Sequence, residues 1–468
     1  MALLSTALSL PIAQSQVDFV IPDIDQDLRL CIDPFLLYKS KDAKHRALHD
    51  RLLEAFNRAF RYYRDGDYAG MERLIDFPEV DNIGLGYSGG RIAGSGMGTY
   101  LNRLVADTLA NSPALLERGV RHIEELQLVS VGIGPDRISD MAANLLKADL
   151  VAYTREQCTT WDIPIEKGVP VDHIFDLDSF SWYDEYVDLP INPRTGVPLL
   201  FVPRRIVRLL PWINFDDYER QQYRLYLRAK KGRGWDALPG AKAPMTKENK
   251  GRIVEVTRRE IHLLDAYVAR KEAHATDAQP ELSRSDKNAN LAPHAQTMLD
   301  RLWAIAPGIA GAGAYQREML GILTYLFSPE LTDGKLEERT IDGTERRDII
   351  FTNEADRSFW QYVRQQYEGL FVMFEAKNVT QVSSQHINQV ATYLGDRIGR
   401  FRVILTRNQP AQAQIRKTHT VFNNDRDRKS ILIMHDGDVE RMLRLKDNGG
   451  DPTRDIQQMY RDFKMKIE

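Results

Sequence analysis

The chain contains 468 residues, of which 43% are hydrophobic and 28% are charged, and its formal net charge is −3. This length predicts two or three folded domains, and the composition is that of a globular protein with more than one core. The near-neutral total excludes a uniformly basic chain, so any nucleic-acid-binding surface has to be a local basic patch.

Two cysteines, Cys31 and Cys158, occur without a CxxC or Cys/His spacing. They predict neither a zinc site nor a disulfide framework, which agrees with a reducing cytoplasm. No apolar run approaches the length that is needed to span a bilayer. Residues 1–14 are apolar enough to resemble a short signal peptide, but no Lys or Arg precedes the apolar stretch. We therefore expect a strand or helix there that packs on the first domain.

The first predicted helix spans residues 44–63, where apolar side chains recur at helical spacing. A glycine-dense segment follows at 83–98, and its Gly84, Gly86 and Gly89 formally satisfy GxGxxG. A phosphate-binding loop of this type follows a strand and opens a helix, whereas no convincing strand precedes this segment. We expect a structural loop here and keep a nucleotide-binding loop as the alternative.

Residues 136–154 read as one helix, and residues 171–188 form an acidic and aromatic segment. Four side chains of that segment could in principle hold a metal ion: His173, Asp176, Asp178 and Asp184. A hydrated acidic loop is the commoner outcome of such a composition, and it is what we expect. Residues 197–213 look like a strand followed by a turn, with prolines at the boundaries.

Lys and Arg outnumber Asp and Glu between residues 224 and 271. Four basic side chains in this stretch could follow a phosphate backbone: Arg228, Lys230, Lys231 and Arg233. The alternative is a solvated helix face with a loop, and the sequence leaves both open. Residues 271–294 are polar and lack aromatic side chains, which indicates a linker.

These changes in composition divide the chain into three predicted parts. The first part, 1–223, is a mixed α/β region of unknown role in targeting, sensing or assembly. The second part, 224–294, is a basic helix and loop with a polar linker. The third part, 295–468, alternates between helical and strand patterns and is predicted to be an α/β domain.

The predicted elements of the C-terminal part follow one another closely. Helices are expected at 313–327, 355–367 and 383–397, and strands at 335–341, 345–351, 370–378, 402–406 and 430–434. A turn at Asp342-Gly343 separates the first two strands. Further helices follow each of the last two strands. This order predicts a mixed central sheet that is flanked by helices.

Charged residues interrupt two of these apolar strands. The strand at 370–378 is apolar until Glu375 and Lys377, whose side chains point to the same face because they are two residues apart. Asp348 stands immediately before three apolar residues of a neighbouring strand. Since unpaired charges in core strands are costly, two carboxylates and a lysine at this place call for a function.

Phosphodiester hydrolysis would require this combination of groups. Mg²⁺ prefers oxygen ligands from one or two carboxylates, with waters and a substrate phosphate completing its shell. Asp348 and Glu375 would hold the ion, in whose place Mn²⁺ would also serve, and the ion would stabilise the charge of the transition state. Lys377 would orient the attacking water or help to deprotonate it.

The ordered set of Asp348 and then Glu375-Ala376-Lys377 resembles the PD-(D/E)XK nuclease superfamily, which has the restriction-endonuclease-like fold. The resemblance covers residues 296–440, and Arg347 stands where the name-giving proline would be. Glu318 on the preceding helix matches the place of an accessory acidic metal ligand in that superfamily. Gln389 and Tyr393 match the QxxxY motif of its RecB-like branch.

This resemblance implies a Mg²⁺-dependent DNA endonuclease that acts in restriction or anti-phage defence in the cytoplasm. Catalytic roles would fall to Asp348, Glu375, Lys377 and Gln389. The expected partners are nucleic acid, DNA rather than RNA, and either a second copy of the chain or a defence subunit, but no membrane. Double-strand cleavage by a single core would favour a dimer.

Other interpretations of the same residues stay open. A nuclease-like module could bind nucleic acid or a partner without cutting it, or a nucleotide could act through the glycine-rich segment. Glu375 and Lys377 could also form an ordinary ion pair at a strand end in an unrelated α/β domain. His386 is a lesser candidate, because a solvated histidine on a helix is more common than a catalytic one.

Overall fold

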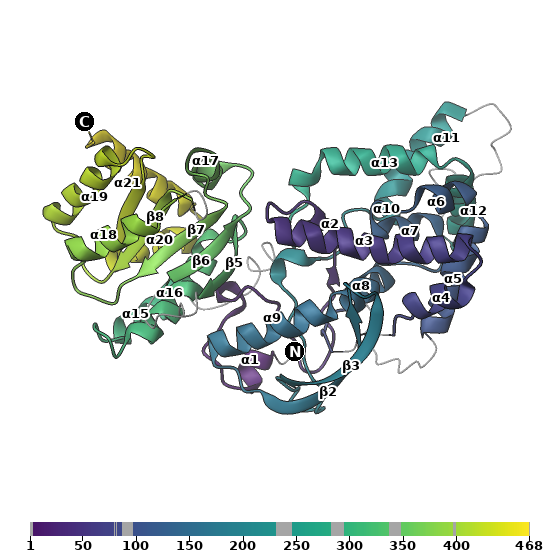
Figure 1. Ribbon diagram of the computed structural model, residues 1–468, viewed down its shortest axis with the longest axis horizontal. Helices are drawn as coiled ribbons and strands as arrows, with labels where there is room; N and C mark the ends of the chain where they lie inside the picture. The colour runs from purple at the N-terminus through teal and green to yellow at the C-terminus, as the bar shows by residue number, and fades with distance from the viewer. Residues whose placement is uncertain are drawn as a thin grey trace. The chain divides into compact units, whose positions relative to one another are not determined.

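The computed structural model describes most of the chain: residues 3–78, 80, 82–86, 97–230, 246–281, 294–336, 348–395 and 399–467. It consists of two compact units (Figure 1). The first unit comprises Met1–Leu10 and Val20–Leu282, and the second unit comprises Pro11–Phe19 and Ser283–Glu468. In the described parts of both units, no helix is both long enough and apolar enough to cross a membrane.

Helices and one long hairpin build the first unit. Its helices are α1 (Leu4–Ala7), α2 (Phe35–Tyr38), α3 (Ala43–Arg64), α4 (Tyr68–Leu74), α5 (Met97–Ala110), α6 (Pro113–Arg118), α7 (Leu126–Val129), α8 (Pro135–Leu145), α9 (Lys147–Trp161), α10 (Phe215–Tyr218), α11 (Arg224–Lys230), α12 (Lys247–Arg259) and α13 (His262–Ala273). Its strands are β1 (Cys31–Ile32), β2 (Glu166–Asp176), β3 (Ser181–Leu189) and β4 (Val207–Arg208).

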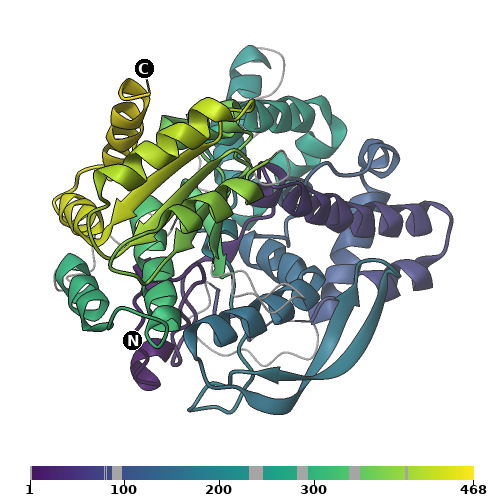
Figure 2. The same ribbon diagram turned by 60° about the vertical axis from the view of Figure 1, so that its left-hand side comes forward.

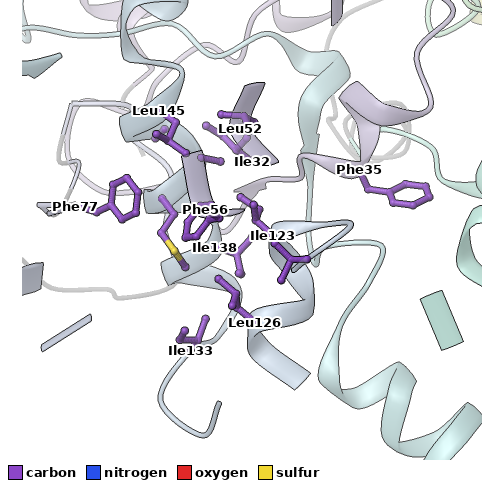
Figure 3. Packing of buried hydrophobic residues seen from close by; sticks show 14 of the residues in the cluster. Ile32, Phe35, Leu52, Phe56, Phe77, Ile123, Leu126, Ile133, Ile138 and Leu145 are labelled. Carbon is purple, nitrogen blue, oxygen red and sulfur yellow. The ribbon is translucent and has the colours of Figure 1, made fainter. Parts of the chain in front are cut away.

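The core of the first unit forms around α3, the helix that was predicted at 44–63. Asp42 caps the start of this helix by accepting a hydrogen bond from the Lys44 N–H at 2.9 Å. Its apolar face, with Leu52 and Phe56, is buried among side chains from α7 and α8 (Figure 3). The helical periodicity of the sequence is therefore confirmed at this element.

Two predictions for the first unit are wrong in detail. The predicted single helix at 136–154 is two helices, α8 and α9, which meet at the non-helical Leu146. The break lets each helix bury its own apolar side chains. Residues 197–213 contain a short 3-10 helix (Arg204–Ile206) followed by the two-residue strand β4, which pairs antiparallel with β1.

The acidic segment at 171–188 is not a loop. It forms most of the β2–β3 hairpin, a long curved ribbon that is visible in both views (Figures 1 and 2). Val169, Val171 and Ile174 are buried against the helices, whereas Asp172 and Asp184 are exposed. Alternation of this kind is typical of a half-buried strand. Across the described residues, no group of three His, Cys, Asp or Glu side chains is arranged to hold a metal.

The division into units also differs from the predicted domains. Residues 246–273, which were expected to belong to a connector, form α12 and α13, and their buried residues, such as Leu264 and Tyr267, join the core of the first unit. Residues 11–19, by contrast, belong to the second unit. The Asp18 carboxylate there accepts a hydrogen bond from the Asp333 N–H at 2.7 Å. A contact between residues so far apart in the chain cannot be predicted from local sequence patterns.

A mixed five-stranded sheet lies at the centre of the second unit, with helices on both of its sides (Figure 2). Its strands, in spatial order, are β5 (Leu331–Leu336), β6 (Asp348–Asn353), β7 (Phe371–Ala376), β8 (Phe401–Thr406) and β9 (Ser430–His435). Its helices are α15 (His294–Ala304), α16 (Ala312–Phe327), α17 (Ser358–Tyr367), α18 (Ser384–Tyr393), α19 (Gln412–Asn424), α20 (Asp436–Asp447) and α21 (Thr453–Met465). The first three strands pair antiparallel and the last three pair parallel.

This arrangement confirms the predicted alternation of helices and strands and the mixed central sheet. Strand β5 begins and ends a few residues before its predicted position, and the turn predicted at Asp342-Gly343 lies outside the described residues. Helix α18 is assigned through Tyr393, four residues short of its predicted end at 397, and residues 396–398 lie outside the described part.

A buried carboxyl pair in the first unit makes its stability dependent on pH. Asp33 and Glu124 are both fully buried, and the Phe35 N–H lies 2.8 Å from Glu124 Oε1 and 3.3 Å from Asp33 Oδ1. Burial raises the pKa of Asp33, and burial together with the nearby Asp33 raises the pKa of Glu124 well above its ordinary value of 4.5. Raised carboxyl pKa values stabilise the fold below pH 4, and this contribution is lost as the pH rises through the folded values.

We expect Glu124→Gln to stabilise the protein increasingly as the pH rises. The amide can still accept from the Phe35 N–H and donate to Asp33, but it carries no buried charge. Urea unfolding should show a larger gain in the free energy of unfolding at pH 8 than at pH 5. The exposed Glu117→Gln is the control. An equal effect of Glu124→Gln at both pH values would contradict this account.

Candidate active site

The carboxyl end of β7 carries a buried carboxylate next to a lysine. Glu375 is 5% exposed, and its Oε1 lies 2.8 Å from Lys377 Nζ. Lys377 follows the strand directly and extends its pairing, because its N–H donates to the Leu405 carbonyl of β8 at 2.9 Å. The two side chains that were predicted to share one face of this strand are therefore in contact.

An arginine that the sequence analysis missed completes this group. Arg402 on β8 is 1% exposed, with Nη1 3.4 Å from Glu375 Oε2 and Nη2 2.8 Å from Met373 Sδ. Each oxygen of Glu375 thus contacts a cation, one from its own strand and one from the neighbouring strand. The signal was present in the sequence, because Arg402 is a lone charge in the otherwise apolar run 401–405.

Asp348 lies directly across the sheet from Glu375. The two residues are partners in the antiparallel register of β6 and β7. Only the backbone of Asp348 is described. Its position therefore agrees with a shared site, and the sequence supplies the carboxylate.

Helix α18 covers this face of the sheet. Phe374 points to the other face, where its ring meets Phe327 of α16 and Trp360 of α17. Glu375 therefore points toward the α18 side, as does its β8 partner Ile404. Ile404 belongs to an apolar cluster to which α18 contributes Ile387 and Val390. The buried members of the cluster are Val382, Ile387, Val390, Leu394, Ile404 and Ile431.

A polar row on α18 comprises His386, Gln389 and Tyr393, which are spaced three and four residues apart and are half-buried. Burial and the nearby Lys377 ammonium lower the pKa of His386, while the Glu375 carboxylate acts in the opposite direction. These influences place His386 within electrostatic reach of both site residues. Its imidazole is neutral at neutral pH, so it brings no further charge.

Glu318 has a different neighbour from the one predicted. Its Oε1 lies 3.3 Å from Arg301 Nε of α15. Burial raises the pKa of Glu318, although the guanidinium of Arg301 acts against this. Helix α16, which carries Glu318, packs on the sheet face that bears Phe374, opposite to Glu375. The structure therefore pairs this candidate metal ligand with an arginine.

A second polar group that the sequence analysis missed lies where β8 and β9 end. Arg407 Nε is 3.1 Å from Asp436 Oδ2, and the Tyr315 hydroxyl donates to Asp436 Oδ1 at 3.1 Å. Arg407 Nη2 also donates to the Ile305 carbonyl at 3.0 Å. These contacts join α15, α16 and α20 at the edge of the sheet that carries Lys377, and so they help to hold the site in shape.

The remaining candidates lie in the first unit. Gly84 has φ of +62°. Its carbonyl accepts a hydrogen bond from the Leu28 N–H at 2.9 Å, and the Gly86 N–H donates to the Leu28 carbonyl at 2.9 Å. Gly84 and Gly86 thus have a structural role, while Gly89 lies outside the described residues. Arg228 is exposed on α11, and Lys230 Nζ lies 5.6 Å from the centre of the Tyr226 ring. Lys231 and Arg233 also lie outside the described residues.

Two comparisons with known proteins found a match. Residues 9–214 match a domain of unknown function (DUF8370). A stretch of 102 residues, 22% of this chain, is 31% identical to the "Putative transposon gamma-delta 80.3 kDa protein" of Escherichia coli (strain K12). The matched stretch covers 14% of the E. coli protein. No solved structure matches the chain. The matched domain ends before β5, the first strand of the five-stranded sheet.

Proposed function

We propose that the second unit is a metal-dependent phosphodiesterase of the PD-(D/E)XK type, with the restriction-endonuclease-like fold, which cuts nucleic acid. One observation carries the proposal: the buried Glu375 at the end of a central strand, in contact with Lys377 and in register with Asp348. A buried carboxylate at this place is costly unless it has a function or compensating partners. The order of antiparallel and parallel strands also suits this fold.

Mg²⁺ or Mn²⁺ suits the donors that Asp348 and Glu375 would supply. Mg²⁺ is usually bound by one or two carboxylates, and waters and substrate phosphate fill the rest of its shell. When bound, the ion would supply charge stabilisation to the phosphate under attack. Glu318 contacts Arg301 and lies on a helix of the other sheet face, so it would have to leave that contact and reach past the strand ends to act as a third ligand.

The chain's own residues would then position the reacting groups. Lys377, in contact with Glu375, would orient the attacking water and offset the negative charge that develops on the phosphate. Gln389 and Tyr393 would donate hydrogen bonds from α18, the helix that covers this face. The neutral imidazole of His386 is a further hydrogen-bonding group on the same helix.

DNA is the substrate that we propose, in restriction or defence against phage, with the first unit serving targeting, sensing or assembly. The name of the relative from E. coli refers to a transposon, and DNA as the substrate agrees with that context. Arg228 and Lys230 would add phosphate contacts from the first unit. Because one core presents one cutting site, we also propose that a second copy or a partner subunit joins for double-strand cleavage.

The decisive experiment is a cleavage assay with purified protein. Supercoiled plasmid, linear duplex, single-stranded DNA and RNA are incubated with Mg²⁺, with Mn²⁺ or with EDTA. We expect cleavage only with metal, and its loss in Asp348→Asn and Lys377→Met. The exposed Asp462→Asn and Lys466→Met are matched controls in the same unit. Cleavage that persists in both site variants would overturn the site. Binding of nucleic acid by wild type without any cleavage would favour a binding module instead.

A further inference from the structure

The surroundings of Glu375 balance its charge before any metal is bound. Lys377 contacts one carboxylate oxygen at 2.8 Å and Arg402 contacts the other at 3.4 Å. Arg402 is 1% exposed and is the second residue of β8, which pairs with a strand on each side, so the surrounding packing holds its guanidinium in this position. Its positive charge is a fixed part of the site.

Counting charges shows what Arg402 changes. Asp348 and Glu375 contribute two negative charges, and Lys377 and Arg402 contribute two positive charges, so their sum is zero. Without Arg402 the same group would carry a net charge of −1. Helix α18, which covers this face, has no Asp, Glu, Lys or Arg between Ser384 and Tyr393, and His386 is neutral. No other residue of this helix offsets the arginine.

We propose that Arg402 makes metal binding at this site depend on the substrate phosphate. This inference rests on the proposed function. A divalent cation that enters a neutral, buried site meets no net attraction and is repelled by a cation that cannot move away. A phosphodiester bound beside Lys377 brings the missing negative charge, so the metal and the nucleic acid bind together.

Linkage requires this coupling to be mutual. If bound nucleic acid tightens metal binding by some factor, the metal tightens nucleic-acid binding by the same factor. Couplings between sites usually correspond to factors of about 5 to 150. Arg402→Met, whose side chain would pack beside Met373, removes the charge and should lower the coupling. It should also tighten metal binding by roughly tenfold when nucleic acid is absent.

The test is a calorimetric titration of the full chain with Mn²⁺, alone and with a 20-base-pair DNA duplex, with the duplex-only titration subtracted. We expect wild type to bind Mn²⁺ weakly alone and at least tenfold more tightly with duplex. Arg402→Met should bind Mn²⁺ more tightly alone and gain little from the duplex. Arg402→Lys, which keeps the charge, should behave like wild type, and Arg416→Met is the exposed control on α19.

The outcomes separate this inference from the proposed function. Equal Mn²⁺ affinity of wild type and Arg402→Met, with binding lost in Glu375→Gln, would overturn the role of Arg402 and leave the site in place. No Mn²⁺ binding by wild type or Arg402→Met, with or without duplex, would overturn both proposals. If Arg402→Met does not fold, Arg402→Gln removes the charge and keeps a polar side chain. Its Mn²⁺ affinity then decides the question in the same way.

Discussion

Glu375→Gln is expected to abolish metal-dependent cleavage and to destabilise the protein at the same time. Loss of a charged metal ligand should remove several kcal/mol of transition-state stabilisation, which corresponds to a fall in rate of roughly a thousandfold or more. The same change leaves the buried Arg402 guanidinium without its carboxylate partner. Breaking a buried ion pair in this way lowers the free energy of unfolding by about 3 to 5 kcal/mol.

The double variant Glu375→Gln, Arg402→Met separates the two effects. It removes both members of the buried pair, so much of the lost stability should return, whereas cleavage should not. Stability is measured by urea unfolding and cleavage with the best substrate of the nuclease assay. Recovery of cleavage in the double variant, or undiminished cleavage in Glu375→Gln, would show that Glu375 is not a ligand of the catalytic metal.

Arg407→Met is expected to destabilise the second unit by about 3 to 5 kcal/mol at neutral pH, since it breaks a buried ion pair. The side chains of Arg407 and Asp436 are only 8% and 10% exposed. The variant would leave the Asp436 carboxyl buried without its cation, and it would also free the Ile305 carbonyl from its hydrogen bond. Urea unfolding at pH 7.5 measures the loss, with the exposed Arg416→Met as the control.

The loss in Arg407→Met should shrink at lower pH. Burial raises the pKa of Asp436 from 3.8 to about 6 in the wild type, and Arg407 opposes this rise. A raised carboxyl pKa stabilises the fold fully below the unfolded value, and this contribution disappears as the pH rises through the folded value. Without Arg407 the pKa of Asp436 rises further, so at pH 5 the carboxyl is protonated. A neutral carboxyl needs no cation beside it, so removing Arg407 costs less free energy of unfolding at this pH. A loss at pH 5 as large as at pH 7.5 would contradict this reasoning.

Local sequence patterns were sufficient for much of the second unit. The largely apolar runs at 370–378, 402–406 and 430–434 predicted strands, because buried parallel strands are apolar on both faces, and β7, β8 and β9 lie there. The two-residue period of a strand also placed Glu375 and Lys377 on one side, where they are 2.8 Å apart. These inferences hold because they depend only on backbone geometry and burial within a single element.

The sequence by itself determined the order of helices and strands in the second unit, the candidate carboxylates Asp348 and Glu375, and the lysine beside them. Only the tertiary structure decided which strands are neighbours, and therefore that Arg402 of β8 meets Glu375. It also decided that Glu318 pairs with Arg301 and that residues 11–19 join the second unit. The reason is physical: periodicity reports which face of an element is buried, whereas pairing between distant elements depends on shape and charge that no single segment contains.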